Sequence, residues 1–176
     1  MRTYSLLLLT LICLAFLGCG DNASGEDQQT FTPIIEGKKV YISGFYQDST
    51  LDQMVACYWL DGIRVDLEYG AAEDITVQNG DVYVAGQWFD ATGWNGEACY
   101  WINGIRYDLQ GGGNPDVEVT GIAVDNGDVY VSGVRSDGSM FGTNACYWKN
   151  GNVNNVSRNS SFGNSWGATA FGIFLD

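Results

Sequence analysis

Histidine is absent from this chain of 176 residues. Without an imidazole the sequence lacks the commonest general base, and Ser-His-Asp and Cys-His catalytic arrangements are excluded. Most zinc and copper sites also depend on histidine, so we expect no metal site and no cofactor. These absences favour a protein that is not an enzyme.

Basic residues are scarce. The chain has 8 Lys and Arg against 21 Asp and Glu, which gives a formal net charge of −13. A domain this acidic repels phosphate backbones, and no basic stripe is present to collect them. We therefore expect no nucleic-acid partner, and any attachment to anionic headgroups has to come from a lipid.

The sequence also lacks an apolar run long enough to cross a membrane as a helix, which takes about 20 residues. Its apolar segment, residues 6–17, follows Arg2 and ends at Gly18-Cys19, the pattern of a secretory signal peptide over residues 1–18. Leu17-Gly18-Cys19 resembles a relaxed lipobox, with Leu17 where Ala or Ser is usual. The resemblance predicts a bacterial lipoprotein lipidated on Cys19, with residues 19–30 as a flexible tether. An ordinary signal peptide cut near Gly18 or Gly20 is the alternative.

Two motifs each occur three times. The tyrosines of a Val-Tyr-Val/Ile-x-Gly motif are 42 and 47 residues apart, and the cysteines of an Ala-Cys-Tyr-Trp motif have the same two spacings. Copies in constant register indicate an internal repeat. The first motif occupies residues 40–44, 82–86 and 129–133, and the second occupies residues 56–59, 98–101 and 145–148.

Each repeat unit predicts four short strands, called a to d. In the second unit these are residues 74–78, 81–86, 98–102 and 105–109, and the first two of them alternate along the strand. Asn-Gly or Asp-Gly pairs separate a from b and c from d, as in type I′ hairpins. Proline is rare and no helical period is present, so the fold class is all-β. The turns lie at 61–62, 79–80, 103–104, 126–127 and 150–151.

A period in the forties with four antiparallel strands is typical of a β-propeller blade. The units resemble the Tyr-Val-Ala-Gly…Ala-Cys-Tyr-Trp-x-Asn-Gly repeats of uncharacterised bacterial lipoproteins and secreted proteins with propeller-like repeats. The resemblance covers residues 31–176 and implies an architecture but no activity. It places tandem four-stranded blades at about 31–68, 73–110 and 117–157, with a partial unit at 167–176.

Three units are fewer than a closed propeller ring usually contains. Residues 172–176 match the strand a at residues 121–125, so the repeat domain consists of three units plus one strand. This predicts a partial or open propeller. The sequence leaves three arrangements open: a fragment of a longer array, a ring closed by self-association, and a short open stack of three units.

The recurring residues are predicted to be structural. Cys57, Cys99 and Cys146 are expected to be small, buried, reduced hydrophobic side chains. A disulfide between two of them, or a metal site of all three, is the alternative. The repeated Tyr and Trp are expected in the core, and ion pairing between units is expected for two pairs that lie two apart on strand d, Arg64 with Asp66 and Arg106 with Asp108.

Candidate ligand-binding residues lie in the variable b–c loops. Loops on a rigid scaffold commonly carry binding sites, and aromatic rings beside carboxylates suit saccharides or cationic groups. The d–a loops, whose lengths are expected to differ, should emerge at the same end. The alternative is that these aromatic rings only cap the core. The candidates are Trp88, Phe89, Trp94, Phe141, Asp48, Asp90 and Asp137.

These observations predict a lipoprotein of the bacterial cell envelope, at the outer membrane or cell surface, attached through the lipid on Cys19. Its repeat domain is expected to be a non-enzymatic binding or scaffold module for a protein or saccharide ligand. A carbohydrate-active enzyme that uses paired carboxylates is the alternative, since 21 acidic residues are available.

Overall fold

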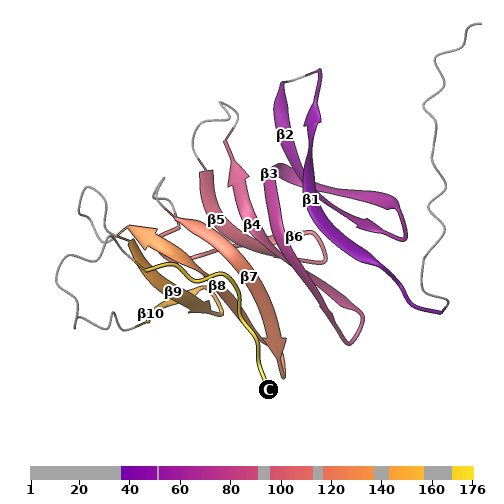
Figure 1. The fold of residues 1–176 in the computed structure, drawn as a ribbon. Coiled ribbons are helices and arrows are strands. Elements are labelled where there is room, and N and C mark those ends of the chain that lie inside the picture. Colours follow the sequence, from indigo (N-terminus) through magenta and orange to yellow (C-terminus); the bar gives the residue numbers. More distant parts are fainter. Residues whose placement is uncertain (1–36, 51, 91–95, 113–116, 137–142, 157–167) are drawn as a thin grey trace, which may run out of the picture.

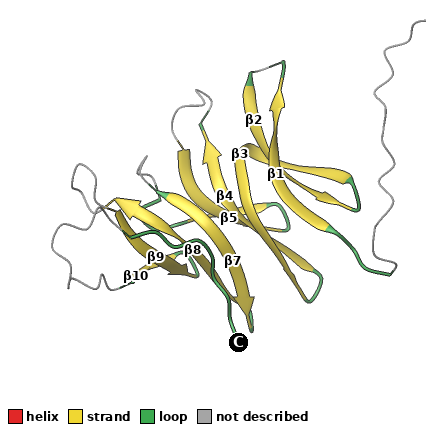
Figure 2. Ribbon diagram, viewed as in Figure 1, coloured by secondary structure: helices red, strands yellow, loops and turns green. Residues whose placement is uncertain are grey.

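The computed structural model describes residues 37–50, 52–90, 96–112, 117–136, 143–156 and 168–176. Within these ranges the secondary structure consists of β-strands and turns, without a helix (Figure 2). Each strand is antiparallel to its neighbours, in two sheets. The all-β prediction is confirmed.

The six-stranded sheet has the order β1-β2-β3-β4-β5-β6, and the four-stranded sheet has the order β10-β9-β8-β7 (Figure 1). Both sheets are therefore meanders, in which each strand pairs with the next one along the chain. The strands are β1 (Tyr41–Asp48), β2 (Gln53–Leu60), β3 (Ile63–Gln78), β4 (Asp81–Phe89), β5 (Gly96–Ile102), β6 (Ile105–Asp108), β7 (Glu118–Asp125), β8 (Asp128–Ser136), β9 (Thr143–Lys149) and β10 (Asn152–Asn155).

The predicted strands a to d are present in two units. In unit 2 they are the second half of β3, then β4, β5 and β6; in unit 3 they are β7 to β10. Unit 1 contributes strands b, c and d as β1, β2 and the first half of β3. Residues 31–36, where its strand a was expected, lie outside the described residues.

The prediction of a separate d–a loop between units 1 and 2 is wrong. β3 remains extended through residues 63–78, pairing with β2 up to Tyr69 and with β4 from Gly70 onward. Figure 1 shows that β3 changes direction between its two halves. Small residues allow this bend: Gly70 has a φ of 150°, and the buried Ala71 and Ala72 follow. The two units thus share one strand.

All five predicted hairpin turns have the expected backbone. Both residues of each turn have positive φ, as type I′ geometry requires. In the turn between β5 and β6, for example, φ is 50° at Asn103 and 83° at Gly104. Asn, Asp and Gly tolerate this region best, which explains why these residue types recur at the turns.

The glycine that ends the first motif has a packing role. A Cβ atom on Gly86 would collide with the carbonyl oxygen of Ala71, and one on Gly133 would collide with that of Glu118. Both glycines lie opposite the position where strand a shifts its register. A β-bulge therefore brings the two backbones too close for a side chain.

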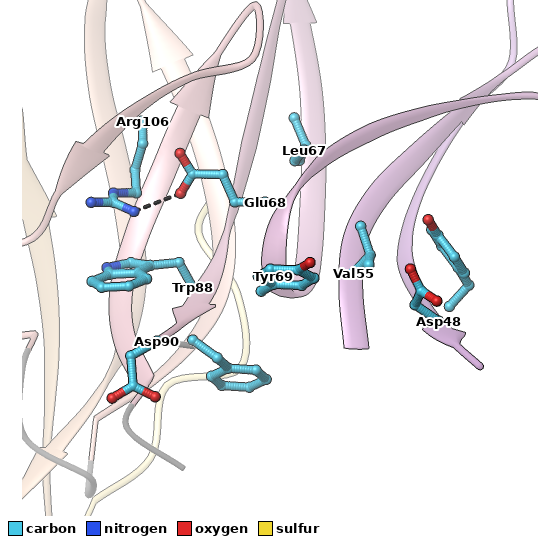
Figure 3. A pocket seen from close by; sticks show the side chains of 10 residues that line it. Asp48, Val55, Leu67, Glu68, Tyr69, Trp88, Asp90 and Arg106 are labelled. Carbon is cyan, nitrogen blue, oxygen red and sulfur yellow. Dashed lines mark hydrogen bonds and ion pairs between the residues drawn. The ribbon is translucent and has the colours of Figure 1, made fainter. Parts of the chain in front are cut away.

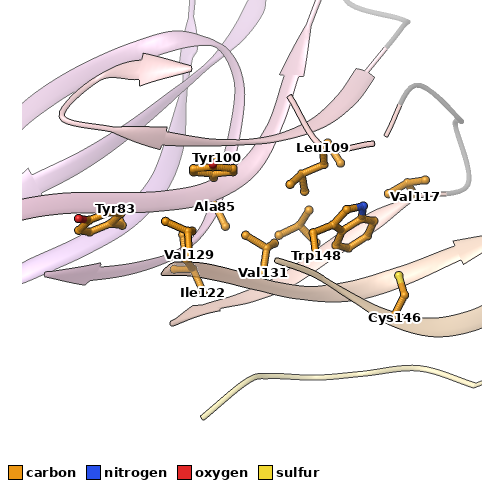
Figure 4. Packing of buried hydrophobic residues seen from close by; sticks show 12 residues of the cluster. Tyr83, Ala85, Tyr100, Leu109, Val117, Ile122, Val129, Val131, Cys146 and Trp148 are labelled. Carbon is orange, nitrogen blue, oxygen red and sulfur yellow. The ribbon is translucent and has the colours of Figure 1, made fainter. Parts of the chain in front are cut away.

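The units stack face against face. Because successive side chains on a strand point to opposite faces, β4 buries Val82 and Val84 against unit 1 and Tyr83 and Ala85 against unit 3. Figure 4 shows the second of these interfaces, where Val129, Val131 and Trp148 of unit 3 lie against unit 2. Each internal interface thus places the valine–tryptophan face of one unit on the tyrosine–alanine face of the unit before it.

The structural roles predicted for the repeated residues are largely confirmed. Cys57, Cys99 and Cys146 are buried and free, so the disulfide alternative is wrong. Burial raises the pKa of Cys57 to about 11 and that of Cys146 to about 11. Trp101 and Trp148 are fully buried, whereas the equivalent Trp59 of unit 1 is only half-buried.

Candidate functional site

A pocket of about 540 Å³ opens between units 1 and 2 (Figure 3). It lies at the end of the stack where strands b and c connect, because it is lined by the last residues of β1 and β4 and by the bend of β3. Its volume is within the range of small-molecule sites, about 300–1,000 Å³. The lining residues are Tyr46, Asp48, Val55, Leu67, Glu68, Tyr69, Trp88, Phe89, Asp90 and Arg106.

Four strands, β1, β3, β4 and β6, position the polar and aromatic groups, and β6 supplies Arg106. Strand β4 ends with Trp88 and Phe89, and Asp90 follows it directly. Strand β1 ends with Asp48. Tyr69 comes from the bend of β3, where the chain crosses from unit 1 to unit 2. The pocket therefore exists because two units meet at this bend.

Arg106 organises one wall of the pocket. Its guanidinium pairs with Glu68 of unit 1 and, at 2.9 Å, with Asp108 of its own strand. The guanidinium carbon also lies 4.1 Å from the centre of the Trp88 ring, close enough for a cation–π contact. The prediction of ion pairing between units is confirmed for Arg106 alone, through Glu68, and this contact holds the Trp88 ring in place. It is wrong for the pairs Arg64–Asp66 and Arg106–Asp108, each of which lies within a single strand.

A similar arrangement occurs one repeat earlier. Arg64 lies 3.7 Å from the centre of the Tyr46 ring and pairs with Asp66 at 2.8 Å. Tyr46 also donates a hydrogen bond to Asp66, and burial together with the nearby Asp66 carboxylate raises the pKa of the Tyr46 phenol. The phenol therefore remains a proton donor at neutral pH.

Unit 3 lacks this arrangement. The repeat spacing places Arg135 where unit 2 has Trp88, and Val153 where unit 2 has Arg106. An arginine stacked on an aromatic ring beside carboxylates is therefore a feature of units 1 and 2. It distinguishes the pocket residues from the turn and core residues, which recur in every unit.

The structure brings together four of the seven predicted ligand-binding residues. Asp48, Trp88, Phe89 and Asp90 all line the pocket. Trp88 also packs against the buried cluster between units 1 and 2, as the core-capping alternative proposed. The other three, Trp94, Asp137 and Phe141, lie outside the described residues.

The sequence did not identify Glu68, Tyr69 or Arg106 as ligand-binding residues. Glu68 and Tyr69 lie where a d–a linker was expected, and Arg106 was assigned only an ion-pairing role. The available signal was the departure from the repeat: Glu68 aligns with Gln110, and Trp88 aligns with Tyr46 and Arg135. Positions that change between otherwise equivalent units mark this site better than loop composition does.

The described residues contain no group of three or more His, Cys, Asp and Glu side chains arranged to hold a metal ion. Over the same part of the chain, no helix is long and apolar enough to span a membrane. Comparison with protein-family models, curated proteins and solved structures finds no match. The resemblance to lipoproteins with propeller-like repeats therefore stays a prediction, and the functional argument depends on the pocket.

Proposed function

We propose that this protein is a lipid-anchored binding protein of the bacterial cell envelope, and that its non-enzymatic repeat domain binds a saccharide in the pocket between units 1 and 2. The observation that carries the proposal is the composition of this pocket. Aromatic rings of Tyr46, Tyr69, Trp88 and Phe89 lie beside the carboxylates of Asp48 and Asp90.

This composition matches the chemistry of a sugar. The apolar face of a pyranose packs on aromatic rings, while its hydroxyl groups need acceptors and donors at the ring edge. Carboxylates supply acceptors, and the guanidinium of Arg106 supplies donors. Because Arg106 is already held by Glu68 and Asp108, the donors are pre-organised, which lowers the entropic cost of binding.

The propeller-like arrangement is part of the same proposal. It is supported by the antiparallel meander in each unit, by units packed face against face, and by tight turns and longer connections at opposite ends. Such a stack provides a rigid base for variable loops at one end. The ligand pocket lies at that end.

Binding of a panel of oligosaccharides by the purified full-length protein tests the proposal, with tryptophan fluorescence and calorimetry as measurements. Phe89→Ala and Asp90→Asn are each expected to weaken saccharide binding by about fivefold or more, since centrally placed contacts contribute about 1 kcal/mol or more. Ile105→Ala and Asp125→Asn change exposed residues at the opposite end, and they are the matched controls.

Two results would contradict the proposal. Binding that survives both pocket variants would place the ligand elsewhere, and binding of a lysine-rich peptide but no saccharide would identify a cationic ligand. Release of reducing ends that is lost in Asp90→Asn would instead support the enzymatic alternative.

The anchor is tested separately. Cys19→Ser is expected to move the protein from the membrane fraction to the soluble fraction, because stable anchoring requires acyl chains on the protein. Immunoblots of fractionated cells report the distribution, and Cys57→Ser, which changes a buried thiol, is the control. Unchanged membrane association of Cys19→Ser would refute lipidation at this residue.

A further inference from the structure

The outer face of unit 1 and the outer face of unit 3 are the two halves of the interface that joins neighbouring units inside the stack. Inside the stack, Val84 and Val131 are each 1% exposed because the preceding unit covers them. The equivalent residue of unit 1, Ile42, is 50% exposed. At the other end, Tyr130 and Tyr147 of unit 3 are half-exposed, while their equivalents in unit 2 are buried.

The C-terminal segment, residues 168–176, lies against unit 3 as β7 lies against unit 2. In the internal case, the amide of Ile122 donates a hydrogen bond of 2.8 Å to Asp74. One repeat further along, Gly121 replaces Asp74, and a Cβ atom built there would lie 3.3 Å from the amide nitrogen of Ile173. The position of Ile122 beside Asp74 is therefore repeated by Ile173 beside Gly121.

This segment has the side-chain pattern of a strand a but no strand partner among the described residues. Ile173 and Leu175 are half-buried, whereas Phe171 and Phe174 are 86% and 89% exposed. Strand β1 is paired on one side only among the described residues, because it forms the edge of the six-stranded sheet. It occupies the strand b position, whose partner in the other units is a strand a.

We propose that a second copy of this chain docks head to tail on unit 3, so that residues 172–176 of one copy pair with β1 of the other and supply strand a to its unit 1. The register follows from that of β7 and β8, in which Ile122 pairs with Val131 and Val124 pairs with Val129. It aligns Ile173 with Ile42 of the second copy, and Leu175 with Val40 of the second copy.

This pairing accounts for the exposed apolar residues at both ends. Ile42 of the second copy is covered by the tyrosine face of unit 3, as Val131 is covered by unit 2. Phe174 aligns with Thr76 of strand β3, so it faces the next unit, where the exposed Val77 of the second copy lies. The contact is heterologous, and it produces a ring if the rotation closes or an open chain of copies if it does not.

The full-length protein, extracted in detergent, tests the association by size-exclusion chromatography with light scattering. We expect a protein mass of at least two copies at micromolar concentration, and at least a tenfold weaker association for Phe174→Asp. Because Phe174 is 89% exposed, this substitution does not disturb the fold of one copy. Ile105→Asp, at a 64% exposed position away from both end faces, is the control and should associate like the wild type.

A single-copy wild-type protein would overturn the proposal, and so would a Phe174→Asp variant that associates normally. The competing occupant of the unit 1 edge is the chain's own residues 32–36, which the repeat spacing aligns with strand a. Occupancy by these residues predicts the single-copy result.

Cysteine cross-linking tests the register. Ile42→Cys and Ile173→Cys are prepared as separate proteins, mixed and oxidised, with wild type as the baseline because its cysteines at 57, 99 and 146 are buried. A disulfide-linked dimer that forms only in the mixture supports the head-to-tail register, since directly paired residues have Cβ atoms about 4.5–5.5 Å apart. Dimers of Ile42→Cys alone would show a symmetric contact and overturn it.

Discussion

At the residue scale, position in the stack determines what a repeated side chain experiences. Cys99 lies within the buried cluster between units 1 and 2, and burial raises its thiol pKa strongly. Cys57 and Cys146 occupy the equivalent positions on their own strands, and burial raises the pKa of each thiol to about 11. The thiolate is the reactive form of cysteine. All three residues therefore act as small core side chains.

Thiol titration provides the first prediction. In the native protein Cys57, Cys99 and Cys146 should not react with a thiol reagent at pH 8, because their thiols are buried and protonated. After denaturation all three should react without a reductant. Raising the pH towards 11 should make Cys57 and Cys146 react before Cys99, whose pKa is the highest. Fewer than three thiols after denaturation would indicate that a disulfide had formed.

At the element scale, the two kinds of hairpin turn differ in what their first residue does. Asn103 of the β5–β6 turn accepts a hydrogen bond from the amide of Val82 at 3.0 Å and donates one to Asp81 at 2.8 Å. Asn150 repeats both contacts in unit 3, with Val129 and Asp128 as its partners. The side chain in the c–d turn thereby fixes the start of strand b, which is the neighbour of strand c in the sheet.

A comparison of two glycine substitutions tests this difference. Asn103→Gly keeps the positive φ but removes both side-chain hydrogen bonds, so the free energy of unfolding should fall by about 1–2 kcal/mol. Asn79→Gly, in the β3–β4 turn, also keeps its φ of 54° and should change stability by less than about 0.5 kcal/mol. Urea denaturation of both variants makes the comparison, and equal effects would mean that only the backbone conformation matters.

The elements differ in how far the sequence could predict them. Hairpins were predictable because alternation and Asn-Gly turns are local signals, and their φ angles agree. The continuous β3 was not predictable, since Tyr69, Gly70 and Ala71 look like a linker until Trp88 and Gln87 are known to lie opposite. The pocket was half predictable. Its b–c residues stood out by composition, but the pairing of Glu68 with Arg106 required knowing which faces of units 1 and 2 meet.

At the scale of the whole molecule, burial is concentrated in the middle of the stack. β4, β5 and β8 each contain at least four buried residues, whereas β1 and β10 contain none. Among the described residues, unit 2 has a neighbouring unit on each face, while units 1 and 3 each have one on a single face. Local stability should therefore decrease from the centre towards both ends.

Amide hydrogen exchange, followed by mass spectrometry, tests this gradient. Exchange should be slowest in β4, β5 and β8 and fastest in β1 and β10, because opening a terminal unit exposes the least apolar surface. The measurement is made on Phe174→Asp, so that pairing between copies does not protect β1. Equal protection of β1 and β5 in this variant would contradict a stability gradient. Compared with the variant, the wild type should show added protection in β1 alone among these strands.

The shared strand β3 has a consequence for how this chain could be divided. A single repeat cannot be cut out between units 1 and 2, because removing β1 and β2 leaves the first half of β3 without its hydrogen-bonding partner. The connection after β6 joins two separate sheets, so a division there breaks no ladder of strand hydrogen bonds. The smallest piece at this end of the protein that keeps its strand ladders intact is therefore the block from β1 to β6, and the repeat of the sequence is not the hydrogen-bonded unit of the fold.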